Sequence, residues 1–309
     1  MTRHADFFMG LALATAVLTA PAPVYAQTRA AATFEREYTR QKNIYHDQEQ
    51  EYVEGYVTDR TLEDYADALP AGFRPSLEAL GPQDRWLDIG AGRGQAILDY
   101  YAAGHDAAHP SEARPLATKA GAVAMSIEDR RTARWKQAAE RVGPTRLQYV
   151  YSKTLREYTV DELGRFRLIT DVIGGFSYTA SLSQFMETTL RFLTVGGTFY
   201  TVLQDVRWED GGNKPYYEGS PFLTQITDAG GADVGVCAWL KRIGCVQVTC
   251  KPRADWKPPL EVYSVRKVCQ DVTVPPLRTV RFTAGTPPER VFQLRDEPPA
   301  TPGREEATR

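Results

Sequence analysis

The feature that most constrains the fold is a glycine-rich stretch at residues 85–101, RWLDIGAGRGQAILDYY. The apolar residues before its glycines predict a short buried strand, and those after them recur at the spacing of a helix. Three glycines at alternate positions, Gly90, Gly92 and Gly94, join the two elements. Glycine tolerates positive φ and lets a ligand approach the backbone closely, next to the N–H groups of the helix start. The stretch therefore predicts a site for a nucleotide-like ligand; the alternative, a plain strand-to-helix turn, needs only one glycine.

The spacing of the glycines separates two classes of cofactor. A dinucleotide-binding loop reads G-x-G-x-x-G, and Gln95 stands where its third glycine would be. The order Asp-x-Gly-x-Gly-x-Gly, which begins at Asp88, instead resembles the first motif of the class I S-adenosylmethionine-dependent methyltransferases. The resemblance implies that the loop wraps the methionine part of S-adenosyl-L-methionine. It also implies that Asp88 helps to hold the amino group of that cofactor, often through water.

Strands and helices alternate after this motif, as a doubly wound parallel sheet requires. Apolar runs predict strands at 122–127, 147–151, 168–173, 245–250 and 260–268 and in TFYTVLQD, with helices in ARWKQAAERV, SQFMETTLRFLTV and VCAWLKRIG. The second of these helices is expected to end at Gly196 and Gly197. Two more stretches, FRLITDVIGGFSYT and LRFLTVGGTFYTVL, resemble the same family. The resemblance implies an α/β fold over residues 76–270: a Rossmann-like seven-stranded sheet with helices on both faces and an antiparallel last strand.

A second cofactor residue is predicted at the end of the second strand. An acid there binds ribose hydroxyls in folds of this kind, and Glu128 is the candidate. The alternatives are Ser126, if the strand register differs, and an ordinary solvated acid. The chain departs from the family after the third strand, where Ser152 and Lys153 replace the acid that often lies near the adenine amino group. It departs again at Arg167, where the family often has aspartate.

The exit of the fourth strand carries the catalytic candidates, Asp171 and Tyr178. Methyl transfer from a sulfonium needs mainly positioning of the acceptor, and sometimes a base. Asp171 ends a central strand, where ligands bind in open α/β sheets, and Tyr178 is placed to orient or deprotonate an acceptor. The alternative for Tyr178 is a packed aromatic. The Asn-Pro-Pro-aromatic exit typical of enzymes that methylate nucleobase or glutamine nitrogens is absent, which favours another small molecule as the acceptor.

Composition limits the partners. The net charge of −2 predicts no broad basic field, so nucleic acid is not expected as a partner. No metal site is predicted, because the histidines show no metal-ligand spacing: His4, His46, His105 and His109.

The two ends differ from the middle. Residues 1–26 have the polar start, apolar run and small-residue ending of a secretory signal, and the run is too short to span a bilayer comfortably. We therefore expect export to the periplasm or the medium, with no stable membrane insertion after cleavage; the alternative is a cytoplasmic or N-terminally anchored protein. Residues 27–75 predict a tyrosine-rich helical extension. Residues 271–309, rich in proline pairs and charges, predict a mobile tail, and a loop at Trp208 is a second candidate substrate loop.

Four cysteines lie in the closing helix–strand–strand unit, and they allow three pairings. A helix antiparallel to the next strand brings Cys237 near Cys250, and an antiparallel seventh strand brings Cys269 near Cys245. Export favours these two disulfides; the alternative is four buried thiols in a cytosolic protein. Three functions remain open: an active methyltransferase, a catalytically silent binding protein on the same fold, and a nicotinamide-dependent oxidoreductase.

Overall fold

The computed structural model describes residues 60–102, 115–204, 221–256, 259–283 and 288–295. The predicted signal peptide, the first part of the tyrosine-rich extension, the four histidines and the loop at Trp208 lie outside these residues. Within them, no helix is both long enough and apolar enough to cross a membrane.

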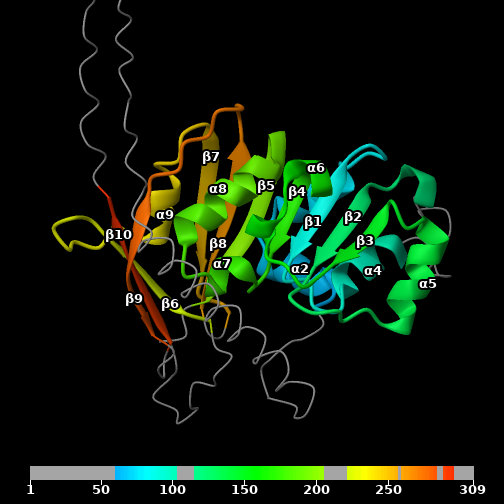
Figure 1. Cartoon of the computed structure of the whole chain (residues 1–309), viewed down its shortest axis with the longest axis horizontal. Helices are drawn as coiled ribbons and strands as arrows, with labels where there is room; N and C mark the ends of the chain where they lie inside the picture. Colours follow the sequence, from blue (N-terminus) through cyan, green and yellow to red (C-terminus); the bar gives the residue numbers. More distant parts are fainter. Residues whose placement is uncertain (1–59, 103–114, 205–220, 257–258, 284–287, 296–309) are drawn as a thin grey trace, which may run out of the picture.

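One seven-stranded sheet forms the centre of the molecule (Figure 1). Its strands are β1 (Arg85–Ile89), β2 (Gly121–Met125), β3 (Leu147–Val150), β4 (Phe166–Asp171), β5 (Leu193–Gln204), β7 (Val246–Arg253) and β8 (Leu260–Lys267). The order across the sheet is β3-β2-β1-β4-β5-β8-β7. The first five strands pair in parallel, and β8 runs antiparallel to both β5 and β7. The α/β fold with an antiparallel last strand is therefore confirmed.

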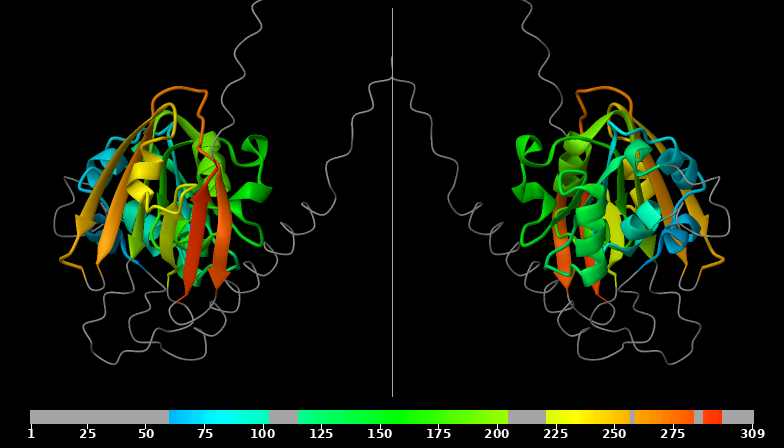
Figure 2. Two further views of the ribbon diagram at one scale, coloured as in Figure 1. Left: turned by 90° about the vertical axis from the view of Figure 1, so that its left-hand side faces the viewer. Right: turned by 90° about the vertical axis from the view of Figure 1, so that its right-hand side faces the viewer.

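Helices cover both faces of this sheet (Figure 2). One face packs against α2 (Leu62–Ala68), α3 (Phe73–Glu78), α4 (Gln95–Ala102) and α5 (Ala133–Val142). The other packs against α6 (Val160–Leu163), α7 (Gly175–Tyr178), α8 (Leu182–Phe192) and α9 (Val236–Leu240). Alternate residues of each strand supply the two cores: Trp86 belongs to the first and Leu87 to the second, and both are fully buried.

The helices begin and end at residues suited to those positions. A capping box between Thr61 and Asp64 starts α2, and the Thr132 hydroxyl accepts the Trp135 N–H at the start of α5. Gly143, at φ +102°, ends α5. Because α2 and α3 share the core of the main sheet, the described part of the predicted extension is built into the domain.

The predicted end of α8 is wrong. The helix stops at Phe192, and β5 begins at Leu193 and runs on through Gly196 and Gly197. A neighbouring strand makes the early stop possible, because the buried Lys267 ammonium donates to the carbonyls of Leu190 (2.8 Å) and Leu193 (3.2 Å) at the helix end. The glycines lie instead where the β4–β5 pairing changes register.

The predicted mobile tail is wrong for its described residues. Two strands, β9 (Leu277–Thr283) and β10 (Glu289–Leu294), form a second sheet with β6 (Leu223–Thr227), in the order β6-β10-β9. Figure 1 shows this sheet beside α9, at the end of the molecule away from β3. Alternate residues of β10 are buried, namely Arg290, Phe292 and Leu294. One of the three is an arginine, which hid the alternation in the sequence.

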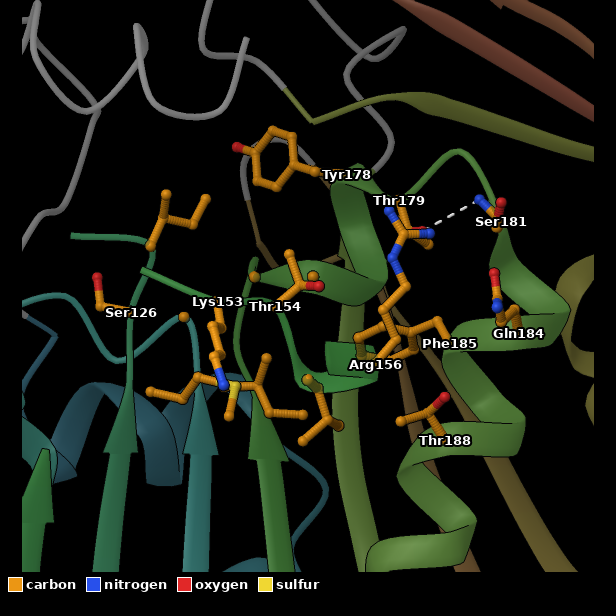
Figure 3. Close-up of a pocket in the computed structure, with 17 residues that line it drawn as sticks. Ser126, Lys153, Thr154, Arg156, Tyr178, Thr179, Ser181, Gln184, Phe185 and Thr188 are labelled. Atoms are coloured by element: carbon orange, nitrogen blue, oxygen red, sulfur yellow. Dashed lines mark hydrogen bonds between the residues drawn. The ribbon is translucent and has the colours of Figure 1, made fainter. Parts of the chain in front are cut away.

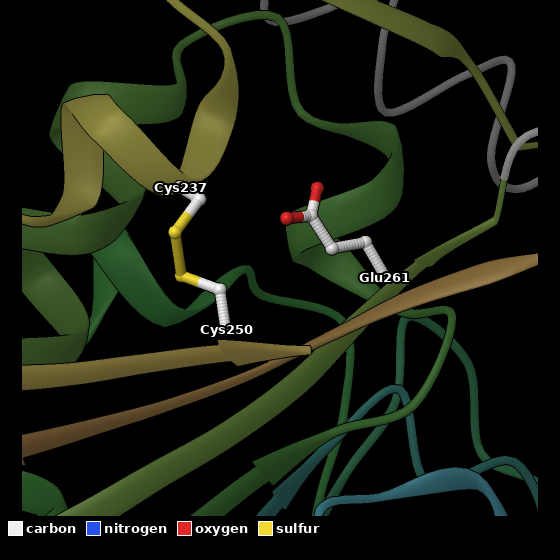
Figure 4. A group of neighbouring side chains, drawn as sticks. All are labelled: Cys237, Cys250 and Glu261. Atoms are coloured by element: carbon white, nitrogen blue, oxygen red, sulfur yellow. A yellow bond between two sulfur atoms is a disulfide. The ribbon is translucent and has the colours of Figure 1, made fainter. Parts of the chain in front are cut away.

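Both predicted disulfides are confirmed. Cys237 of α9 is bonded to Cys250 of β7 (Figure 4), and Cys245 is bonded to Cys269. The 13- and 24-residue separations close short loops around β7 and β8. The final helix and the sheet edge are therefore covalently joined.

Candidate functional site

The loop after β1 has the backbone that its glycines require. Gly90, Gly92 and Gly94 have φ of +73°, +55° and +77°, in the region that side chains disfavour. The loop ends at the N-terminus of α4, at the carboxyl edge of the sheet where ligands bind in open α/β folds.

The glycines have different neighbours. A Cβ on Gly90 would lie 2.9 Å from the Cα of Gly174, so the loops after β1 and β4 touch through their backbones. A Cβ on Gly94 would lie 2.3 Å from Cζ3 of Trp135 in α5. Gly94 thus allows close packing between the loop and α5, and its cofactor-binding role stays a prediction.

Tyr149 of β3 fixes the same loop and was missed by sequence reasoning. Its hydroxyl donates to the Gly92 carbonyl at 2.6 Å and lies 3.4 Å from the Glu128 carbonyl. Its ring meets Trp135 edge-on at 5.2 Å. One tyrosine therefore joins the glycine loop to the segment after β2, which places the two predicted cofactor segments side by side.

Asp88 is completely buried beneath this loop. Its carboxylate accepts the Tyr65 hydroxyl of α2 at 2.9 and 3.0 Å and the Thr170 hydroxyl of β4 at 2.7 Å. Burial raises the pKa of Asp88 to about 7, although both hydroxyls oppose the shift. Asp88 therefore joins the end of β1 to α2 and β4 through these two hydroxyls, and its contact with the cofactor stays a prediction.

A cavity opens beside the glycine loop (Figure 3). It is walled by the ends of β1 and β2, by the turn after β3 with the short helix η3 (Leu155–Glu157), and by α7 and α8. Its apolar lining includes Ile89, Met125, Ile127, Leu155 and Phe185. Figure 3 shows polar side chains from the segments after β2 and β3 facing those of α7 and α8 across the cavity.

The two residues considered for ribose binding have different positions. Ser126 lines the cavity, and its buried hydroxyl has no hydrogen-bond partner among the described residues. Glu128 lies outside the lining; its side chain is 17% exposed and stands 3.9 Å from the Arg130 guanidinium. The position favours the alternative, Ser126. At the next strand, Lys153 lines the cavity and pairs with Glu162 at 3.6 Å.

The exit of β4 combines a buried acid with a strained turn. Asp171 is fully buried, and its two oxygens accept the N–H groups of Gly174 (2.9 Å) and Phe176 (3.0 Å). Ile173 has φ +56°, which is unusual for a β-branched residue and marks strain of the kind found at functional sites. Asp171 therefore shapes this turn and caps the start of α7, and its catalytic role stays a prediction.

Tyr178, the other catalytic candidate, ends α7 and lines the cavity. Its side chain is mostly buried, and its ring meets Phe222 edge-on at 6.5 Å. Of the seven predicted site residues, two line the cavity, Gly90 and Tyr178, and five lie outside its lining: Asp88, Gly92, Gly94, Glu128 and Asp171.

A group with the spacing of metal ligands lies elsewhere, at Cys237, Cys250 and Glu261 (Figure 4). The two sulfurs are bonded to each other, so neither is a thiolate that a cation needs as a ligand. The Glu261 carboxylate instead accepts the Tyr263 hydroxyl at 2.5 Å. The group is a disulfide beside an acid.

No family model matches the chain, and no curated protein matches it. Among solved structures it is similar to the N-methyltransferase NodS of Bradyrhizobium japonicum in complex with S-adenosyl-L-homocysteine, at 11% identity and a TM-score of 0.43 over 74% of this chain and 98% of that one. It is also similar to a precorrin-6y C5,15-methyltransferase of Geobacter metallireducens, at 11% identity and a TM-score of 0.36 over 70% of this chain and 93% of that one. A third similar structure is an rRNA methylase of Streptococcus thermophilus, at 12% identity and a TM-score of 0.36 over 64% of this chain and 95% of that one.

Proposed function

We propose that the chain binds S-adenosylmethionine beside the loop after β1 and transfers its methyl group to a small-molecule acceptor. One observation carries the proposal: the segments that follow β1, β2, β3 and β4 meet around a single cavity at the carboxyl edge of the sheet. The glycine loop that forms part of its wall reads Asp-x-Gly-x-Gly-x-Gly and has the backbone that this spacing requires.

The residues present fit this cofactor. Gly90 and Gly174 both line the cavity and carry no side chains, so a ligand can approach their backbone closely. The Ser126 hydroxyl is a buried polar group free to bond a ribose hydroxyl. Met125 and Leu155 give apolar surface suited to an adenine ring.

The chain's contribution to the reaction is positioning. The cofactor supplies a methyl group activated by a sulfonium, so the protein needs to align an acceptor and exclude water. Tyr178, on the cavity wall, is the group that we assign to orient the acceptor or accept its proton. Asp88 and Asp171 hold the loops that form the wall.

We also propose that the protein is exported. Two disulfides support this, because such bonds persist in oxidising compartments and are rare in the cytosol. The sequence of residues 1–26 supplies the matching signal.

Calorimetry of the purified chain with S-adenosylmethionine, S-adenosylhomocysteine and NAD tests the cofactor. We expect both sulfur compounds to bind and NAD not to bind. Absence of binding by both sulfur compounds would overturn the proposal, and binding of NAD alone would indicate an oxidoreductase.

Methyl transfer needs a separate test. Incubation with deuteromethyl-labelled S-adenosylmethionine and a small-molecule extract, followed by mass spectrometry, should reveal a labelled product. If the cofactor binds but no label is transferred, the chain is a silent binding protein on the same fold.

A further inference from the structure

Helix α7, which carries Tyr178, is a single turn of four residues. A turn this short is not stable alone, because nucleation of a helix is unfavourable and its end carbonyls lack partners. The Asp171 carboxylate holds its start through the N–H groups of Gly174 and Phe176. Its other end therefore needs a donor from elsewhere in the chain.

That donor is Arg290 of β10. Its guanidinium donates from Nη2 to the Phe176 carbonyl at 2.7 Å and from Nη1 to the Thr179 carbonyl at 2.8 Å. Nε donates to the Thr224 hydroxyl of β6 at 2.8 Å. The side chain is completely buried and crosses 111 residues of sequence to reach Thr179.

The fork of an arginine suits this arrangement. Its planar guanidinium presents several N–H groups in fixed directions, so one side chain can bond two carbonyls and a hydroxyl at once. A lysine offers one ammonium, which cannot reproduce this pattern. The β10 backbone is itself fixed by pairing with β6 on one side and β9 on the other.

We propose that Arg290 is a positioning residue of the cavity. Through its hydrogen bonds, the second sheet fixes the positions of Tyr178 and Thr179. This proposal rests on the proposed function, in which Tyr178 contacts the acceptor. Both residues line the cavity, and Thr179 accepts one of the Arg290 hydrogen bonds with its carbonyl. A substitution at Arg290 should therefore alter the shape of the cavity wall without replacing a residue that lines it.

Hydrogen–deuterium exchange with mass spectrometry tests the proposal in the full chain. Arg290→Lys should speed exchange in the peptide containing residues 174–181 by roughly tenfold, the scale of losing a hydrogen bond to a charged group. Exchange in the peptides of β1 and β5 should stay unchanged. Arg281→Lys is the matched control, because Arg281 lies on the neighbouring strand and its guanidinium makes an exposed ion pair with Glu289 at 3.2 Å.

Affinity for S-adenosylhomocysteine gives a second readout, which should weaken several-fold in Arg290→Lys and not in Arg281→Lys. If the unmodified chain does not bind this compound, the proposed function fails, while the exchange measurement still decides the role of Arg290. Equal exchange at residues 174–181 in the unmodified chain and Arg290→Lys would overturn the proposal, as would faster exchange everywhere.

Thr224→Val covers the case in which Arg290→Lys does not fold. It removes the Thr224 hydroxyl to which Nε donates and keeps the shape of the side chain. We expect a smaller rise in exchange at the same peptide. No rise there would contradict the proposal.

Discussion

At the scale of single residues, two buried acids lie side by side at the carboxyl edge of the main sheet. Asp88 and Asp171 end or nearly end the adjacent strands β1 and β4, and both are fully buried. Burial raises the pKa of each to about 7, from an ordinary value of 3.8. Each accepts protein hydrogen bonds that favour the ionised form, but these only partly offset the loss of water.

These pKa values predict how stability depends on pH. Between pH 4 and 7 the folded state holds protons that the unfolded state releases, so the free energy of unfolding should fall as the pH rises through this window. Asp88→Asn should flatten that fall, because it removes one of the two groups. Urea unfolding at pH 5 and pH 8 measures the change in the free energy of unfolding. The control is Asp161→Asn, because Asp161 is exposed on α6. An unchanged slope in Asp88→Asn would contradict the expectation.

A pair of variants assigns the ribose contact. Ser126→Ala should weaken binding of S-adenosylhomocysteine by about 1 kcal/mol, or roughly fivefold, because it removes the unpartnered hydroxyl in the cavity. Glu128→Ala tests the prediction from the sequence. A loss of about 1–3 kcal/mol there by calorimetry would keep Glu128 at the ribose, and no loss would leave that role to Ser126.

Gly90 should be intolerant of any side chain. Gly90→Ala places a Cβ 2.9 Å from the Gly174 Cα and forces a positive φ on alanine. We expect about 1–3 kcal/mol of lost stability in urea unfolding, together with loss of cofactor binding. Gly143→Ala is the control, since it also has positive φ but no atom within 4 Å of the added Cβ. Equal losses in both variants would show that the contact with Gly174 has no effect.

At the scale of elements, buried cations end three helices. Lys119 donates to the Tyr100 carbonyl in the last turn of α4, Lys267 donates at the end of α8, and Arg290 donates at the end of α7. Each is nearly inaccessible to solvent, and both Lys267 and Arg290 lie far along the chain from the helices that they cap. Such charges complement the negative end of a helix and satisfy carbonyls that have no partner within it.

Lys267→Met tests this arrangement away from the cavity. It keeps an apolar side chain but leaves the carbonyls of Leu190 and Leu193 without this donor, so we expect about 1–3 kcal/mol lower stability in urea unfolding. Lys251→Met, exposed on β7, should change stability by less than about 0.5 kcal/mol. Similar effects of the two substitutions would argue against a capping role.

The elements show which features the sequence could predict. The glycine loop follows from local spacing, the cysteine pairing follows from the antiparallel closing unit, and the seven-stranded sheet was implied by the family resemblance. By contrast, Arg290 and Lys267 look like surface charges in the sequence, because their partners lie in distant segments. Tyr65 is similar: its spacing predicts a helix face, but nothing local shows that its hydroxyl bonds Asp88.

At the scale of the whole molecule, both sheets contribute to the cavity beside the glycine loop, while the two disulfides lie elsewhere. The main sheet supplies the loops, and the second sheet supports α7 from the far side. The disulfides join α9 and the last strands of the main sheet, away from the cavity lining.

The intact mass of the natural protein tests export. We expect a chain that begins at Gln27 and is four hydrogens lighter than its reduced form, because the signal is removed and two disulfides form. Treatment with a reductant is the control and should restore the four hydrogens. A full-length chain with four alkylatable thiols would contradict both expectations.

The position of Arg290 near the end of the described chain also has a consequence for synthesis. A ribosome synthesises every strand of the main sheet before it reaches residue 290, and only then does α7 gain the donor for its last carbonyls. The cavity wall is therefore finished by one of the last described segments of the chain. A chain cut short before β10 would retain the residues that line the cavity yet lack the contact that holds part of them in place, so an intact C-terminal region is a condition for a complete cavity.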